Sequence, residues 1–140
     1  MHWKQKIMLV LLCLFSSVVS AASLTMVSTP MAIHRLDEAT CLLMKFPEKQ
    51  TALNPNAKME QILVTVRYGQ PVLASAQVCN AQKKDCHQVG PDHRISGSFF
   101  NYQNITKPIW LCVAVHTWYG YYPPVFVYAE YTAWTRRQFK

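Results

Sequence analysis

The sequence predicts an all-β fold: a single antiparallel β-sandwich or small barrel of about six to eight strands, braced by disulfides. Apolar and polar residues alternate in short runs instead of repeating with the period of a helix. Turn-forming Gly, Pro, Asn and Asp residues separate these runs. An even number of cysteines follows the first 21 residues, which is typical of small exported domains.

Residues 1–21 have the three parts of a secretory signal peptide. The basic start MHWKQK precedes the apolar run IMLVLLCLF, and small residues then suit cleavage before Ala22. The apolar run is shorter than the roughly 20 residues that span a membrane. We expect cleavage, a periplasmic or secreted mature protein without a membrane span, and one β-sandwich domain over 22–140. The alternative is a buried N-terminal helix of a cytosolic protein.

The first part of the mature chain has the weakest pattern. Residues 22–40 are the least readable, and 34–46 (HRLDEATCLLMKF) are expected to hold a helical turn or two running into a strand that ends at Pro47.

The run 108–118 is apolar on both faces, which is typical of a strand inside a sheet. Five later runs are expected as strands: 61–68, 72–79, 95–102, 108–118 and 125–134.

Four cysteines in 22–140 predict two disulfides. Cys79 and Cys86 end two runs that are joined by NAQKKD, a segment of turn-forming and charged residues. This arrangement favours a Cys79–Cys86 bond across a hairpin. It leaves Cys41 to pair with Cys112.

Few residues are candidates for catalysis or metal binding. Ser96, His93 and Asp92 are close in sequence, but GPDHRISGS is typical of a turn that enters a strand. Zinc competes with the disulfides, because three histidines are available: His87, His93 and His116. The Cys-x6-Cys spacing, however, differs from that of most structural zinc sites. We expect no enzyme, no metal and no cofactor.

The charge of the chain is basic but dispersed. It has 14 Lys and Arg against 7 Asp and Glu, and the tail TRRQFK is the only basic cluster. Scattered charge favours solubility over nucleic-acid binding, so we expect no nucleic-acid partner.

The segment 116–128, HTWYGYYPPVFVY, is the most unusual of the chain. Tyrosine and tryptophan provide large contact areas at small entropic cost, so an aromatic turn between two strands can be a recognition surface. The alternative is that the rings cap an open end of the sandwich and are mostly buried. Trp118 and Tyr121 are the preferred anchors. The candidate binding residues are Trp118, Tyr119, Tyr121 and Tyr122.

The order of these motifs resembles a known family. The Cys-bracketed hairpin VCNAQKKDCHQV is followed by SGSFF, KPIWLCVAV, the turn YGYYPPVFV and a final strand. Over 60–135 this layout resembles the FlhE family, small periplasmic all-β flagellar proteins of enteric and related bacteria. The cysteine loop is longer here, and the aromatic loop is richer, than in that family. The resemblance implies a role in flagellar assembly or export through protein contact, with flagellar export or rod components as partners.

The leading prediction is an exported, non-enzymatic protein-binding domain with a flagellar accessory or chaperone-like role. Within the class of binding proteins, the alternative is an exported inhibitor or a carbohydrate-binding module that uses the aromatic loop as a stacking platform. From a different class, the alternative is a metal-dependent hydrolase centred on the three histidines.

Overall fold

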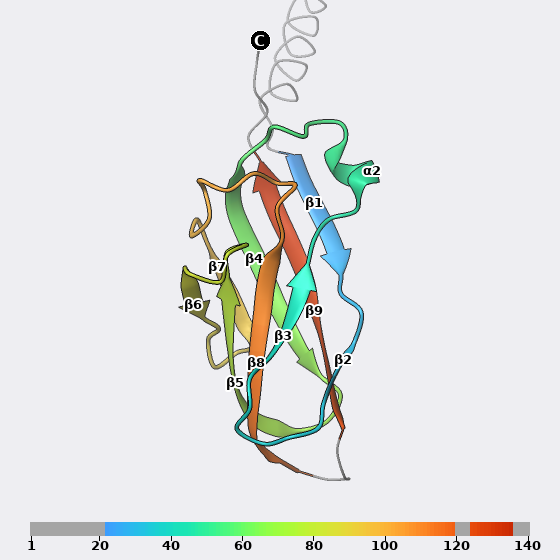
Figure 1. Cartoon of the computed structure of the whole chain (residues 1–140), viewed down its shortest axis with the longest axis vertical. Helices are drawn as coiled ribbons and strands as arrows, with labels where there is room; N and C mark the ends of the chain where they lie inside the picture. The colour runs from blue at the N-terminus through green and yellow to red at the C-terminus, as the bar shows by residue number, and fades with distance from the viewer. Residues whose placement is uncertain (1–21, 120–123, 136–140) are drawn as a thin grey trace, which may run out of the picture.

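The computed structural model describes residues 22–119 and 124–135, which form two antiparallel sheets (Figure 1). Sheet A has the strand order β1-β9-β4-β7, and β2 also pairs with β9. Its strands are β1 (Ala22–Val27), β2 (Met31–Ile33), β4 (Met59–Tyr68), β7 (Arg94–Gly97) and β9 (Val125–Thr135). Sheet B has the order β3-β8-β5-β6. Its strands are β3 (Thr40–Met44), β5 (Val72–Cys79), β6 (Cys86–Gln88) and β8 (Ile109–Trp118).

The predicted all-β, antiparallel, disulfide-braced sandwich is confirmed, and the sheets do not close into a barrel. The described residues contain nine strands, whereas the sequence predicted about six to eight. The additional strands, β1 and β2, lie in the segment whose pattern was weakest. Both pair with β9, so their conformation depends on a partner about 100 residues away. Strands β4, β5 and β9 lie where the alternation predicted them, and β8 lies in the run that is apolar on both faces.

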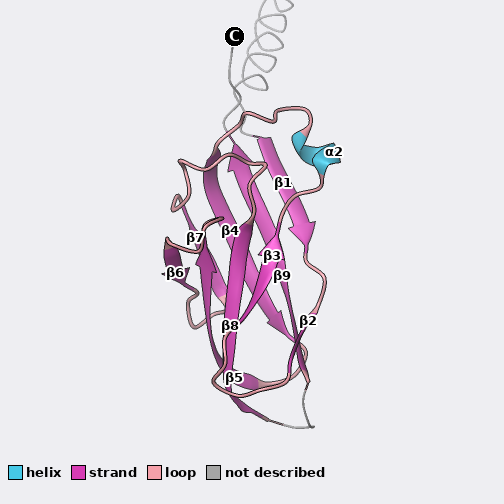
Figure 2. Cartoon of the chain, viewed as in Figure 1, coloured by secondary structure: helices cyan, strands magenta, loops and turns pink. Residues whose placement is uncertain are grey.

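Two local predictions were wrong. Residues 34–39 form turns instead of a helix, and the single helical turn of the described chain, α2 (Glu48–Thr51), comes after Pro47 (Figure 2). Proline at this place suits a helix start, because its missing N–H would have no partner there. The predicted strand over 95–102 ends at Gly97, and turns follow it. No helix within 22–119 or 124–135 is long and apolar enough to cross a membrane.

The core lies between the two sheets. Alternate residues of β4 (Ile62, Val64, Val66) are buried. In β9, every second residue from Val125 to Thr135 is buried. Tyr131 is the largest of these side chains, and its ring stacks on Phe46 with centroids 4.5 Å apart. Its hydroxyl donates to the sulfur of Met59 at 3.6 Å, and burial raises the pKa of this phenol well above its usual value.

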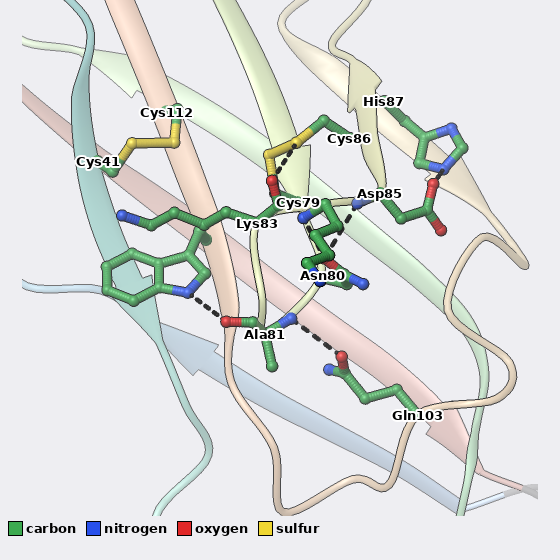
Figure 3. The surroundings of a disulfide bond; sticks show 12 residues. Cys41, Cys79, Asn80, Ala81, Lys83, Asp85, Cys86, His87, Gln103 and Cys112 are labelled. Atoms are coloured by element: carbon green, nitrogen blue, oxygen red, sulfur yellow. Dashed lines mark hydrogen bonds and ion pairs between the residues drawn. A yellow bond between two sulfur atoms is a disulfide. The ribbon is translucent and has the colours of Figure 1, made fainter.

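Both predicted disulfides are present, and each links two directly paired residues of sheet B (Figure 3). Cys41–Cys112 joins β3 to β8, and Cys79–Cys86 joins β5 to β6. The two edge strands have only five and three residues. Short edge strands make few ladder hydrogen bonds, so the disulfides hold both edges of sheet B to its two long inner strands.

Candidate functional site

One end of the sandwich is formed where β4 turns into β5 and β8 ends. The N–H of Gly69 donates to the carbonyl of Phe126 in sheet A at 2.8 Å, and the N–H of Tyr119 donates to the carbonyl of Pro71 at 2.9 Å. A Cβ at Gly69 would lie 3.3 Å from the Phe126 carbonyl, so the close approach favours glycine. The β4–β5 connection therefore ties together the two sheets at this end. We call it the aromatic end.

Two large rings are exposed at the aromatic end. Tyr119 is 57% exposed and Phe126 is 52% exposed. A cavity of ≈ 630 Å³ opens there, lined by Tyr119 and the β4–β5 connection. Tyr68, whose ring packs edge-on against His93, lines this cavity, and burial raises the pKa of its hydroxyl. Exposed aromatic side chains beside a cavity are typical of surfaces that bind a partner.

The predicted binding residues fall into two groups. Trp118 is the last residue of β8, lies opposite Val72 and packs half-buried against the core. Tyr119 follows it and projects into solvent. Tyr121 and Tyr122 lie outside the described residues. In the described part of the loop, Trp118 therefore has the packing that the alternative interpretation expected, whereas Tyr119 has the exposure that recognition requires.

The opposite end of β5 carries a side-chain network centred on Asn80, which is buried (Figure 3). Its Oδ1 accepts hydrogen bonds from the backbone N–H groups of Lys84 at 2.9 Å and Asp85 at 3.1 Å. Its Nδ2 donates to the hydroxyl of Tyr102 at 3.0 Å, and that hydroxyl donates to Asp85 Oδ2 at 3.0 Å. We call this end, with the Cys79–Cys86 disulfide, the hairpin end.

Further contacts join the hairpin turn to the strand and loop beside it. Trp110 Nε1 donates to the carbonyl of Ala81 at 3.0 Å, and the N–H of Ala81 donates to Gln103 Oε1 at 3.1 Å. The ammonium of Lys83 lies 3.9 Å from the centroid of the Trp110 ring. The turn residues predicted from NAQKKD thus form a structured connection instead of a free loop.

The three histidines considered for zinc lie on different elements. His87 is in β6, and its ring stacks on that of Phe99 with centroids 4.2 Å apart. Its Nε2 lies 2.8 Å from Asp85 Oδ1, but the geometry is not that of a hydrogen bond. His93 lies in the turn before β7, and His116 lies in β8. Among the described residues, no three His, Cys, Asp or Glu side chains are grouped to hold a metal. The expectation of no metal stays a prediction.

The triplet Ser96, His93 and Asp92 is not arranged for nucleophilic catalysis. Asp92 Oδ1 accepts from the N–H of Arg94 at 3.3 Å, and the His93 ring packs against Tyr68. The segment is a turn entering β7, as the sequence indicated.

A different serine, histidine and aspartate are brought together, and no sequence motif indicated them. Ser75 Oγ lies 2.9 Å from His116 Nε2, and His116 Nδ1 lies 2.6 Å from Asp37 Oδ1. The three residues come from β5, β8 and the turns before β3. Ser75 and His116 are 41 residues apart in the sequence, and Asp37 and His116 are 79 residues apart, so only the folded structure reveals their proximity.

Comparison with known proteins gives a likeness of fold. No protein-family model and no curated protein matches the sequence. The chain is similar to the crystal structure of FlhE, with a TM-score of 0.59 and 10% identity over 84% of this chain and 97% of that one. A serine protease of Aeromonas sobria gives a TM-score of 0.53 at 9% identity, over 82% of this chain and 27% of the protease. Tomato aspermy virus gives 0.57 at 11% identity, over 84% and 79%.

At these identities the likeness shows the fold alone. The match extends over nearly the whole length of FlhE but only about a quarter of the protease. The chain therefore has the sandwich fold of FlhE, the family that the order of its sequence motifs resembles.

Proposed function

We propose that this chain is an exported protein-binding domain and a flagellar accessory or chaperone-like protein, which contacts flagellar export or rod components from the periplasmic side. The observation that carries the proposal is the likeness to FlhE, which spans 97% of that protein and agrees with the order of motifs in the sequence. Two disulfides are consistent with an oxidising compartment outside the cytoplasm.

The aromatic end is the proposed contact surface. Tyr119 and Phe126 are exposed on either side of the β4–β5 connection, and backbone hydrogen bonds from that connection fix the position of each residue's main chain. A ring on a fixed backbone loses little conformational entropy when a partner covers it. Tyr119 is the favoured anchor, because it is also one of the four residues that the sequence singled out.

The experiment is complementation of a deletion strain of the organism that encodes the chain. Deletion should alter flagellar number or swimming, and the wild-type gene should restore both. The double variant Tyr119→Ala/Phe126→Ala should fail to restore them while reaching the wild-type level in the periplasmic fraction. A matched control is Leu53→Ala, which removes an exposed apolar side chain from the turn that follows α2. Normal flagella in the deletion strain would overturn the proposal, and saturable glycan binding at Tyr119 would favour a carbohydrate-binding module instead.

A further inference from the structure

The geometry points to a nucleophilic serine, Ser75, on the outer face of sheet B, which takes short neutral acyl groups from activated esters with His116 as its base and Asp37 as a positioning residue. This site departs from the expectation of a domain without catalytic activity. It is independent of the proposed flagellar role.

The two contacts of His116 suit the ring tautomer that nucleophilic catalysis needs. An ionised Asp37 only accepts hydrogen bonds, so His116 Nδ1, 2.6 Å from Asp37 Oδ1, carries the ring proton. In the neutral ring Nε2 is then an acceptor, and the Ser75 hydroxyl donates to it across 2.9 Å. Nucleophile, base and orienting carboxylate are thus connected in the order that activates a serine.

The backbone is irregular at two of the three residues. Leu73 pairs with Thr117 and Ala74 with Val115, so the register of β5 and β8 shifts and leaves His116 without an opposite residue. Such bulges redirect a side chain and are common beside active sites. Asp37 has φ of 59°, in the left-handed region, and its N–H donates to the carbonyl of Val115 at 2.8 Å. This bond holds the Asp37 turn against the strand that carries His116.

A cavity of ≈ 220 Å³ lies beside the serine. None of the side chains that line it is charged, and its one cysteine, Cys112, is disulfide-bonded. Two of its residues, Gln77 and Gln88, are paired across β5 and β6 and bring side-chain amides. Amide N–H groups can stabilise the oxyanion of a tetrahedral intermediate. A small neutral cavity of this kind suits a short uncharged acyl group such as acetyl. The lining residues are Ala39, Ser75, Ala76, Gln77, Gln88, Cys112 and Ala114.

The reaction balances with water as the second reactant. Ser75 Oγ bonds to the ester carbonyl carbon while His116 Nε2 takes its proton. The bond to the leaving oxygen then breaks, and that oxygen takes the proton from His116. Water, deprotonated by His116, attacks the acyl-serine, releases the carboxylic acid and restores Ser75.

The exposure of the site limits the substrate class. The side chains of His116 and Asp37 are 40% and 72% exposed, so water screens their interaction. A screened pair stabilises the imidazolium less than a buried pair does. Activated esters, which have good leaving groups, are therefore the expected substrates, and amides are not.

The test uses the purified mature chain with its disulfides intact, a fluorophosphonate probe and 4-nitrophenyl acetate. The probe should label Ser75, identified by peptide mass spectrometry, and Ser75→Ala should abolish both labelling and ester hydrolysis. His116→Gln should slow labelling by about 10²-fold or more, as expected for loss of a general base. The matched control is Ser96→Ala, which removes an exposed strand serine and should leave both rates unchanged.

Asp37→Asn tests the positioning role, because asparagine tolerates the left-handed backbone at this residue. The variant should slow labelling and also change the ¹⁵N shifts of the His116 ring as Nδ1 loses its preference for the proton. If Asp37 had only a structural role, the variant would lower the melting temperature and leave those shifts unchanged. Labelling of Ser75 no faster than that of Ser96 in the wild-type chain would overturn the proposal, as would a wild-type rate in folded His116→Gln.

Discussion

The hairpin end and the aromatic end of the sandwich each present an exposed tyrosine, but the two rings are held differently. Tyr102 at the hairpin end is 51% exposed, and its hydroxyl forms hydrogen bonds with Asn80 and Asp85. Tyr119 at the aromatic end is 57% exposed and is positioned through its backbone N–H. Exposure alone therefore does not distinguish a structural ring from a recognition ring; the hydrogen bonds of the side chain do. We expect the hairpin end to provide stability and the aromatic end to provide contact with a partner.

The largest expected effect comes from the disulfides. In the chain-entropy model, removing Cys41–Cys112 by double alanine substitution costs about 4.4 kcal/mol, and removing Cys79–Cys86 costs about 2.5 kcal/mol, because the first closes a longer loop. Their sequence separations are 71 and 7. Urea unfolding of both double variants measures the difference. A hairpin variant that is as unstable as the other would mean that the network around Asn80 depends on its disulfide.

Asn80→Ala breaks the hairpin end without touching its disulfide. The buried amide makes three hydrogen bonds, and its loss leaves the N–H groups of Lys84 and Asp85 unpaired. We expect a loss of about 2–3 kcal/mol in unfolding free energy. Gln82→Ala in the same turn is the control, since this side chain is exposed, and it should change stability by less than about 0.5 kcal/mol. Equal stability of the two variants would contradict the structural role of the network.

Trp118→Ala and Tyr119→Ala separate packing from recognition within two neighbouring residues. Trp118 packs half-buried against the core, so its loss should cost about 1–3 kcal/mol. Tyr119 is exposed, so its loss should cost less than about 0.5 kcal/mol. Thermal unfolding followed by circular dichroism measures both. A larger loss of unfolding free energy for Tyr119→Ala would show that the ring packs against the protein and is not available to a partner.

The sequence predicted what depends on local pattern. Alternation identified β4, β5 and β9, a run that is apolar on both faces identified β8, and two cysteines around a turn identified a cross-strand disulfide, because the residues concerned are neighbours in the chain. Strands β1 and β2, whose conformation depends on pairing with the distant β9, were missed. Strand β2 has three residues and no pattern of its own.

The difference between local pattern and long-range pairing also explains which site residues could be predicted from the sequence. Aromatic composition pointed to Tyr119, but it did not distinguish that ring from Trp118, which lies opposite Val72 and packs partly buried against the core. The contact between Ser75 and His116 requires the shifted register of β5 and β8, which no local signal reveals. Phe126 looked like any outward residue of a strand, and only its hydrogen-bonded neighbour Gly69 places it at the aromatic end.

The most direct test of the difference between the two ends is photo-crosslinking in flagellated cells that export the chain. A photoreactive amino acid is placed at Tyr119 in one strain and at Tyr102 in another, since the two rings are almost equally exposed. We predict a crosslinked adduct with a flagellar export or rod protein at position 119 and none at position 102. An adduct of equal yield at position 102, or none at position 119 in cells that assemble flagella normally, would contradict the assignment of the aromatic end as the binding surface.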